Sequence, residues 1–426
     1  MSADNDSRGA SSSHDLLRDG AKQGWKGEAM TKAYVAGTCD TKGDELRYIR
    51  NLIEAAGVET CLVDVGTKGT DEDVNVTAVE VAAHHPQGAD AVLGGDDRGA
   101  AVTIMAEAFA RFVATRNDIG GMIGAGGSGN TAVITAGMRT LPIGTPKIMV
   151  STVASADVAP YVGPNDIAMV YSVADVAGLN RITRAVLGNA ANALVGMIKH
   201  EVPKGKHKPA VGMTMFGVTT PCVDQLRALL KEDYDCLVFH ATGTGGQSME
   251  KLVESGMVKG CIDATTTEVC DLLMGGVFSA GPQRFDAIAR AGLPYVGSCG
   301  ALDMVNFGAK ETVPEKYKGR NIYVHTPQVT LLRTSPDENR MMGEWIGNKL
   351  NSCVGPVRFL IPEGGVSLID APGAPFHDPE ADAALFVALE RTVEQNEKRQ
   401  ILRYPHHIND PAFAEALVTA WREIAG

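Results

Sequence analysis

The sequence has no apolar run long enough to span a bilayer, and its first residues carry no apolar core of the kind that a secretory signal needs. Hydrophobic residues make up 44% of the chain and charged residues 21%, a balance typical of a globular protein. These features argue against a membrane-spanning protein. They predict a cytoplasmic location with no membrane partner.

The chain also lacks the cysteine patterns of a disulfide scaffold or a structural zinc site. Its eight cysteines are scattered, with no C-x-x-C pair and no histidine at zinc-finger spacing. We therefore expect reduced thiols. The eight positions are Cys39, Cys61, Cys222, Cys236, Cys261, Cys270, Cys299 and Cys353.

Basic residues are in the minority. Lys and Arg total 39 against 51 for Asp and Glu, which gives a formal net charge of −12. Such a balance argues against a general binder of nucleic-acid backbones, although small anions can still bind locally. Glycine, by contrast, is abundant, with 48 residues where an average composition of roughly 7% would give fewer. Because the glycines cluster just after apolar runs, they indicate ligand-binding loops.

A chain of 426 residues is too long for one hydrophobic core, so we expect two domains. Residues 1–31 are rich in Ser, Asp and Gly and predict a disordered extension. Apolar runs then alternate with helical patterns over 32–202 and again over 209–426, separated by a basic, proline-bracketed linker at 203–208. This alternation predicts an α/β fold of two Rossmann-like, three-layer domains with mostly parallel sheets.

The stretch from Ala33 to Glu45 reads as a strand, a polar turn and a helix. In an open α/β sheet, such a turn lies at the carboxyl end of its strand, where backbone N–H groups face a ligand. Its side chains include hydroxyls, a carboxylate and a cation, which suit a triphosphate with magnesium. The spacing is not that of a P-loop, and an ordinary turn that caps the helix is the alternative. The candidate phosphate-binding residues are Thr38, Asp40, Thr41, Lys42 and Gly43, with Asp40 also a candidate metal ligand.

Two acidic positions follow. Asp64 ends the second expected strand, where an acidic residue commonly binds a ribose hydroxyl in dinucleotide folds, although a solvated strand end fits equally well. Asp96 and Asp97 lie in a Gly-Gly-Asp-Asp turn before the expected helix 99–114, and they could hold a metal or cap that helix.

A second glycine-rich turn follows the apolar strand near residue 121. Its spacing Gly124-x-Gly126-x-x-Gly129 meets the dinucleotide fingerprint, but it does not follow the first strand, and the next strand ends in Ser151 rather than in an acid. We therefore interpret it as a backbone cradle for a phosphate or carboxylate. The residues expected to contribute are Gly126, Gly127, Ser128, Gly129 and Asn130.

The second half repeats the same arrangement of strands and helices. Its own glycine-rich turn runs from His240 to Glu250 after an apolar strand, and Glu268 and Cys299 lie near the starts of later helices. We consider these four side chains as candidate acid, base or nucleophile. The alternatives are a core position for His240 and a buried structural thiol for Cys299.

Four segments carry a resemblance to a known family. They are 37–45 (Gly-Thr-Cys-Asp-Thr-Lys-Gly-Asp-Glu), 124–131, 240–250 and the His-His-Ile-Asn-Asp-Pro segment at 406–411. With these in the same order, the chain from about residue 31 onward resembles the Tm-type ATP-binding family, that of the N-terminal domain of the tomato mosaic virus resistance protein and its bacterial and fungal relatives. The resemblance implies a two-domain, Rossmann-like protein that dimerises and binds ATP with Mg²⁺.

The function expected from the sequence is therefore an ATP-binding protein in small-molecule metabolism, with no nucleic-acid partner. One alternative is a hydrolase, lyase or isomerase that acts on a small anionic carboxylate or sugar acid in an interdomain cleft. A third possibility is a non-catalytic nucleotide sensor or scaffold for a separately encoded TIM-barrel partner. The resemblance further implies a homodimer.

Overall fold

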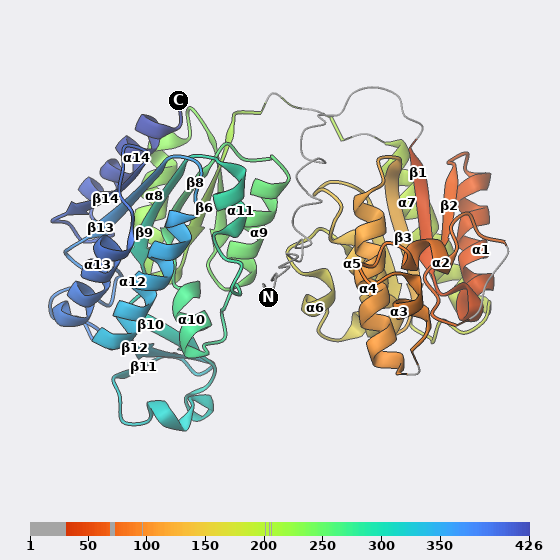
Figure 1. Cartoon of the computed structure of the whole chain (residues 1–426), viewed down its shortest axis with the longest axis horizontal. Helices are drawn as coiled ribbons and strands as arrows, with labels where there is room; N and C mark the ends of the chain where they lie inside the picture. The colour runs from red at the N-terminus through yellow and green to blue at the C-terminus, as the bar shows by residue number, and fades with distance from the viewer. Residues whose placement is uncertain (1–30, 69–72, 96, 201, 204, 206) are drawn as a thin grey trace, which may run out of the picture. The chain divides into compact units, whose positions relative to one another are not determined.

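The computed structural model describes residues 31–426 except 69–72, 96, 201, 204 and 206. The expected extension at 1–31 thus lies outside the described residues except for Thr31, as do parts of the expected linker at 203–208. The chain divides into two compact units between residues 204 and 205, and each is described by itself (Figure 1). No helix of the described residues is long and apolar enough to cross a membrane.

Unit 1 is built on a five-stranded sheet of order β2-β1-β3-β4-β5, in which every strand pair is parallel. The register aligns Ala36 of β1 with Val63 of β2 and with Gly124 of β3. The strands are β1 (Lys32–Gly37), β2 (Thr60–Asp64), β3 (Ile119–Gly126), β4 (Lys147–Ser151) and β5 (Ala168–Tyr171).

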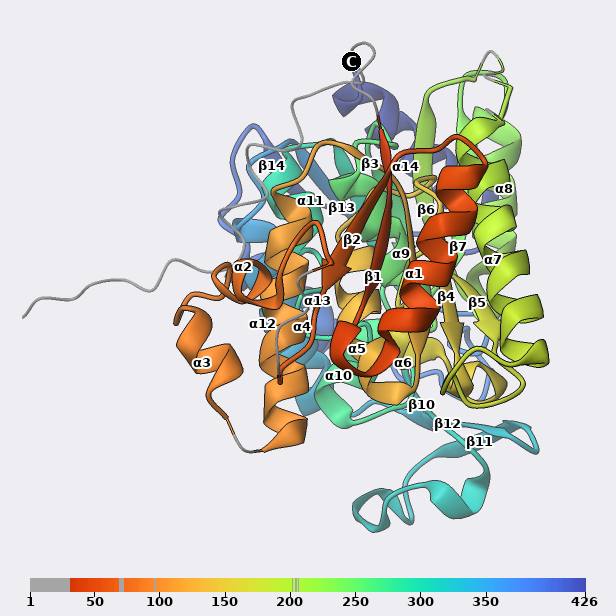
Figure 2. The same cartoon turned by 90° about the vertical axis from the view of Figure 1, so that its right-hand side faces the viewer.

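Helices cover both faces of this sheet, and apolar side chains fill the two layers between helices and strands. Figure 2 shows α1 and α7 on one side of the sheet and α4 on the other. The helices are α1 (Cys39–Ala55), α2 (Ala78–Ala82), α3 (Ala89–Leu93), α4 (Arg98–Ala114), α5 (Ser128–Met138), α6 (Ala159–Val162) and α7 (Arg181–Lys199).

Unit 2 repeats this plan with a six-stranded parallel sheet of order β14-β13-β9-β8-β6-β7. The strands are β6 (Ala210–Met215), β7 (Asp235–His240), β8 (Cys261–Thr265), β9 (Tyr295–Gly300), β13 (Val357–Pro362) and β14 (Arg399–Tyr404). The expectation from the sequence did not include β14. Its segment lies at the edge of the sheet and is only partly buried, so it carries little of the apolar pattern that marks a central strand.

The helices of unit 2 also form two layers. One face carries α8 (Thr220–Leu230) and α14 (Pro411–Ile424). The opposite face carries α9 (Thr244–Glu254), α10 (Glu268–Met274), α11 (Asp286–Ala291), α12 (Pro336–Asn351) and α13 (Pro379–Thr392). Two α/β units with mostly parallel sheets confirm the predicted fold class.

A small antiparallel sheet of order β10-β12-β11 is inserted after β9, below the main sheet of unit 2 in Figure 1. It consists of β10 (Met304–Phe307), β11 (Ile322–Thr326) and β12 (Val329–Arg333). Of its strands, only β11 was expected from the sequence. The insertion marks the edge of unit 2 at which the parallel strands end.

The sequence predicts two capped helix starts, at Ser335-Pro-Asp-Glu338 and at Asp410-Pro411, and they have opposite outcomes. Ser335 and Glu338 form the expected reciprocal capping box at the start of α12. Asp410, by contrast, does not cap α14 with its side chain, because its Oδ2 accepts a hydrogen bond from the His407 N–H instead.

Candidate functional site

The strand order of unit 1 places a topological switch point between β1 and β3. The chain leaves β1 into α1 on one face of the sheet and leaves β3 into α5 on the other. At such a point the two loops diverge at the carboxyl edge of the sheet, where open α/β folds bind their ligands. The turn at 38–43 and the turn at 126–130 are therefore brought side by side, as neighbouring strands lie about 4.8 Å apart.

The turn after β1 is polar and largely accessible. Asp40 and Thr41 are exposed, and Thr38 and Lys42 are half-buried. The hydroxyls of Thr38 and Thr41 lie 2.8 Å apart. Lys42 has non-helical backbone angles (φ −129°, ψ 16°), so the first turn of α1 is kinked, and the Thr38 side chain at the N-cap makes no capping hydrogen bond. Gly43 is buried.

Asp64 holds this turn in place from the end of β2. Its side chain is 1% exposed, and its Oδ1 accepts hydrogen bonds from the Cys39 N–H and the Gly66 N–H, both at 2.9 Å. A carboxylate engaged in this way orients the backbone of the turn. The placement argues against the ribose contact that the sequence suggested for Asp64.

The turn after β3 leaves its backbone open. Gly126 has a φ of +152°, and the Asn130 side chain occupies the space that a Cβ at Gly126 would need. At Gly127, by contrast, a Cβ would meet only the Thr152 Oγ1, at 3.7 Å. No side chain caps α5, and Ser128 at its first position is exposed. Among the described residues, no side chain accepts a hydrogen bond from the N–H groups at the start of α5.

Asn130 and Gly129 complete this turn. The Asn130 Nδ2 donates to the Ala125 carbonyl at 3.1 Å, and the Asn130 Oδ1 is buried without a partner among the described residues. Gly129 packs close to α4, since a Cβ there would lie 3.7 Å from Val102 Cγ2. Thr152, whose hydroxyl faces Gly127, was not among the residues predicted from the sequence. Its position directly after β4, at the same edge of the sheet, could have identified it.

The candidate metal ligands are not gathered into a metal site. Asp97 caps α4, because its Oδ1 accepts from the Gly99 N–H at 2.8 Å and the Ala100 N–H at 3.3 Å. This argues for the capping alternative at Asp97. Asp96 lies outside the described residues. Over the described part of the chain, no group of three or more His, Cys, Asp and Glu side chains could hold a metal ion by itself.

The glycine-rich turn of unit 2 is filled by the protein itself. The N–H groups of Gly243 and Gly246, at the start of α9, donate to Glu268 Oε1 at 2.8 and 3.0 Å. A Cβ at Gly246 would overlap the other oxygen of Glu268, and one at Gly245 would overlap the His240 carbonyl. These glycines therefore allow close internal packing, and the helix start near Gly246 is not available to a ligand's carboxylate.

Arg284 joins Glu268 to two further buried acids. Its guanidinium lies 2.9 Å from Glu268, 3.3 Å from Glu250 and 2.7 Å from Asp263. Glu250 also accepts hydrogen bonds from the N–H groups of Phe285 and Ala287, which begin α11. Burial raises the pKa of Glu250 and of Glu268, against the opposing charge of Arg284.

This arrangement argues against the acid and base roles suggested for Glu250 and Glu268. Glu250 is 8% exposed and Glu268 1% exposed, and each is bonded to Arg284 and to backbone N–H groups. The two carboxyl groups support the starts of α9 and α11. No pattern in the sequence points to Arg284, because only the fold brings it to these acids.

Cys299 and His240 have opposite environments. Cys299 is fully buried, and burial raises the pKa of its thiol well above the ordinary value, which argues against the suggested nucleophilic role and for a structural thiol. His240 ends β7 and is exposed, with its ring centroid 5.3 Å from that of Phe216. The core alternative for His240 is therefore excluded.

The His-His-Ile-Asn-Asp segment is occupied by structural contacts. Nδ1 of His407 accepts from the Asn409 N–H at 3.1 Å, so its Nε2 carries the proton and donates to the Ser367 carbonyl at 2.8 Å. The Asn409 Oδ1 accepts from the Cys222 N–H in α8 at 3.3 Å. The segment thus links the loop after β13 to α8.

A second buried cluster of acids surrounds Arg333. Its guanidinium lies 2.7 Å from Asp382 and 3.5 Å from Asp370. Asp303, also buried, accepts a hydrogen bond from the Ser367 hydroxyl at 2.7 Å. Burial, together with the charges of Asp303 and Asp382, raises the pKa of Asp370 to about 9. Asp370 therefore holds its proton more tightly than an ordinary aspartate.

Comparison with known proteins matches both units to one family. The model for the N-terminal domain of an uncharacterised protein family, UPF0261, matches residues 31–203, and the model for its C-terminal domain matches residues 208–425. A UPF0261 protein of Rhizobium meliloti is 59% identical over 93% of this chain and 100% of its own length. Another from Clostridium tetani is 46% identical over 91% of this chain and 97% of its own.

A plant protein is also similar. The ToMV resistance protein Tm-1 of Solanum lycopersicum is 42% identical over 92% of this chain. The match covers 56% of the tomato protein.

Proposed function

The chain belongs to the uncharacterised protein family UPF0261, and within that family we propose that unit 1 binds a nucleotide through its phosphates at the switch point between β1 and β3. ATP with Mg²⁺ is the proposed ligand. The observation that carries the proposal is the open backbone at Gly127 and Ser128, beside the hydroxyl-rich turn at 38–43.

The backbone at the start of α5 supports an anion as the ligand. Its N–H groups have no side-chain acceptor, and the positive end of the helix dipole favours negative charge there. Apart from the chain neighbours of Gly127, the described atom nearest to an ideal Cβ there is the Thr152 hydroxyl oxygen, at 3.7 Å. A phosphate oxygen could therefore approach the main chain at this point.

The turn after β1 supplies complementary groups. Lys42 offers a cation, and Thr38 and Thr41 offer hydroxyls that can donate to phosphate oxygens. Thr38 follows β1 directly, while Ser128 follows the neighbouring β3. Both turns could therefore contact one chain of phosphates.

Magnesium fits this site through the nucleotide. Mg²⁺ usually keeps several waters and binds to one or two carboxylates together with substrate phosphates, so a full protein cage is not required. Asp40 is the exposed carboxylate in the turn, and its Oδ1 lies 3.5 Å from the Cβ position of Gly66. In this proposal, Asp40 holds the ion, which would neutralise charge on the phosphates.

Isothermal titration calorimetry with ATP and Mg²⁺ tests the proposal. Lys42→Ala should weaken binding by about 1.5–3 kcal/mol, the usual contribution of a hydrogen bond to a charged group. Lys32→Ala is the matched control, because Lys32 begins the same strand at the opposite edge of the sheet. We expect it to bind ATP like the native protein.

Gly127→Val tests the second turn independently. The backbone at Gly127 (φ −85°) can accept a side chain, so we expect a folded variant whose added methyl groups block the phosphate. Native-like affinity in both Lys42→Ala and folded Gly127→Val would refute the site.

A further inference from the structure

Three aromatic rings meet at the carboxyl edge of the unit 2 sheet. Phe216 follows β6, His240 ends β7, and Phe278 lies in the loop between α10 and α11. The ring centroids of Phe216 and His240 are 5.3 Å apart, and those of Phe216 and Phe278 are 6.2 Å apart. Phe216 is largely covered, whereas His240 is exposed and Phe278 is half-buried.

Neighbouring loops extend this surface with apolar side chains. The loop that carries Phe278 packs on the turn after β7, because a Cβ at Gly243 would lie 3.3 Å from the Phe278 carbonyl. The loop after β13 joins it through a hydrogen bond of 3.0 Å from the Leu368 N–H to the Val218 carbonyl. Leu368 is 57% exposed and Val277 59% exposed, which is high for such side chains.

The four segments that form this surface contain no Asp, Glu, Lys or Arg, although charged residues make up 21% of the chain. The segments are 216–221, 240–244, 275–281 and 364–369. We call this surface the ring patch. An uncharged, apolar surface at the edge where α/β sheets bind ligands is a feature of a binding site for an apolar group.

We propose that the ring patch is a second ligand site, separate from the nucleotide site of unit 1, which takes a neutral molecule with a planar aromatic ring. The ring stacks against His240 and Phe278 and contacts Val277 and Leu368. Aromatic rings favour offset or edge-to-face contacts at centroid distances of about 4.5–7 Å, the range in which Phe216 already meets both neighbours.

The surroundings of the ring patch disfavour an anionic ligand. The N–H groups of Gly243 and Gly246 already donate to Glu268, and Arg284 is buried and bonded to acids. A carboxylate placed here would therefore be desolvated without a strong partner. At this edge we therefore propose a neutral, aromatic ligand in place of the small anionic metabolite that the sequence suggested.

The experiment uses indole as a neutral aromatic probe, benzoate as a charged aromatic one, and cyclohexylmethanol as a neutral ring that is not planar. Each is titrated into the full-length protein while NMR follows the imidazole C–H signals, and loss of one signal in His240→Asn assigns His240. We expect indole to shift the His240 signal and to bind more tightly than either other probe.

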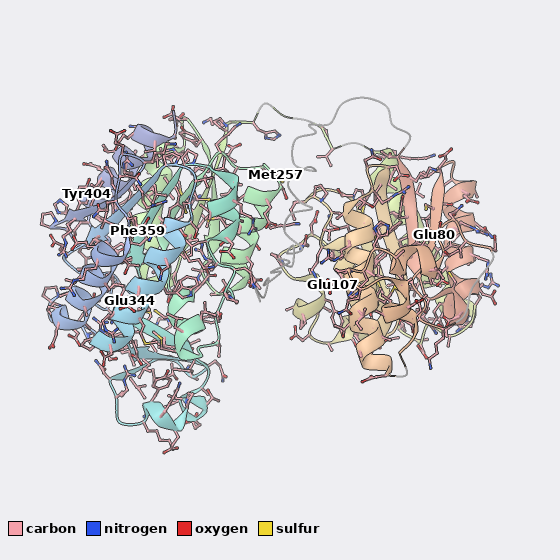
Figure 3. All side chains as sticks on the ribbon, in the orientation of Figure 1. Glu80, Glu107, Met257, Glu344, Phe359 and Tyr404 are labelled. Carbon is pink, nitrogen blue, oxygen red and sulfur yellow. The ribbon has the colours of Figure 1, made fainter. Side chains whose placement is uncertain are left out.

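Two variants locate the binding. Phe278→Ala and His240→Ala should each weaken indole binding by about five- to tenfold, because each removes one aromatic contact. Met257→Ser is the control, since Met257 is 48% exposed and precedes β8, at the opposite edge of the unit 2 sheet (Figure 3). It should bind indole like the native protein.

The proposal fails if indole leaves the native His240 signal unmoved, if benzoate binds more tightly than indole, or if both variants keep native affinity. The signal of the native protein needs no variant, so misfolding of Phe278→Ala cannot decide the outcome. ATP binding is tested with other variants, in unit 1. Failure of one proposal therefore does not imply failure of the other.

Discussion

The two units use the same element, a glycine-rich turn between a parallel strand and a helix, with opposite results. In unit 2, the turn after β7 closes on Glu268, which accepts the N–H groups of Gly243 and Gly246 and is itself bonded to Arg284. In unit 1, no acid of the described residues accepts the N–H groups at the start of α5, and a Cβ at Gly127 would have room.

The difference shows that a run of glycines does not by itself mark a ligand loop. A Cβ at Gly246 would overlap the buried Glu268 carboxylate, whereas a Cβ at Gly127 would meet only the Thr152 hydroxyl, at 3.7 Å. The same local sequence pattern thus forms a turn whose N–H groups are bonded within the protein in unit 2, and a turn with an accessible backbone in unit 1. The predictions below test that contrast, from the largest expected effect to the smallest.

Removal of the cation in unit 2 should have the largest effect. Arg284→Met leaves Asp263, Glu250 and Glu268 buried without their counter-charge, so we expect the free energy of unfolding to fall by about 3–5 kcal/mol. Urea unfolding followed by tryptophan fluorescence measures it, because Trp345 and Trp421 both lie in unit 2.

The control is Arg290→Met. Arg290 pairs with Glu254 at 3.0 Å but is 43% exposed, and exposed pairs contribute about 0–1 kcal/mol. Equal losses in the two variants would mean that the Arg284 cluster is not what supports the turn.

The closed turn should not tolerate even a methyl group. In Gly246→Ala, the new Cβ overlaps Glu268, and relief of that contact must disturb the Arg284 cluster. We expect a loss of about 1–3 kcal/mol, the usual cost of overpacking a core. A variant as stable as the native protein in the same urea titration would show that the turn can open.

The acids of unit 2 should also make its stability depend on pH. Asp370 has a pKa raised to about 9 in the folded protein, while an unfolded aspartate titrates near ~4. Folded protein therefore holds a proton that unfolded protein releases, so the free energy of unfolding falls as the pH rises from about 4 towards 9.

Asp370→Asn removes this proton exchange. The free energy of unfolding of Asp370→Asn, relative to that of the native protein, should therefore increase as the pH rises from about 5 to about 8.5, a range between the two pKa values. Urea unfolding at each pH measures both free energies. The control is Asp337→Asn, since the Asp337 side chain is 88% exposed. A native-to-variant difference that does not change with pH would contradict the assignment.

The open turn should give the smallest change in stability. Gly127→Ala adds a Cβ that meets only the Thr152 hydroxyl at 3.7 Å, so the free energy of unfolding should change by no more than about 0.5 kcal/mol. Circular dichroism follows the unfolding, since both tryptophans of the described residues lie in unit 2. A loss of unfolding free energy as large as that of Gly246→Ala would show that the turn at Gly127 is packed as closely as the turn at Gly246.

Much of the fold could be predicted from the sequence, because local patterns of residues specify many of its strands and helices. The apolar run at 33–36 and the amphipathic helix that follows place β1 and α1, and the Ser335 and Glu338 pair marks the start of α12. The edge strand β14 and the strands β10 and β12 of the inserted sheet were not predicted. Their formation depends on partners distant in the sequence, which the local pattern does not name.

The candidate residues divide in the same way. The sequence placed Thr38 and Ser128 correctly in turns after strands, because strand and helix signals fix those positions. It could not show that Glu250, Glu268 and Cys299 are buried, since burial of a polar side chain depends on which segments fold over it.

The two α/β units follow from local sequence patterns, because hydrophobic periodicity and glycine placement act over a few residues. Which glycine-rich turn is open depends instead on long-range packing. In unit 2 the distant acid Glu268 reaches the helix start and accepts its N–H groups, whereas no acid of the described residues does so at Gly127. Such a contact joins residues that are distant in the sequence, so it forms only when the chain folds and cannot be predicted from a local pattern.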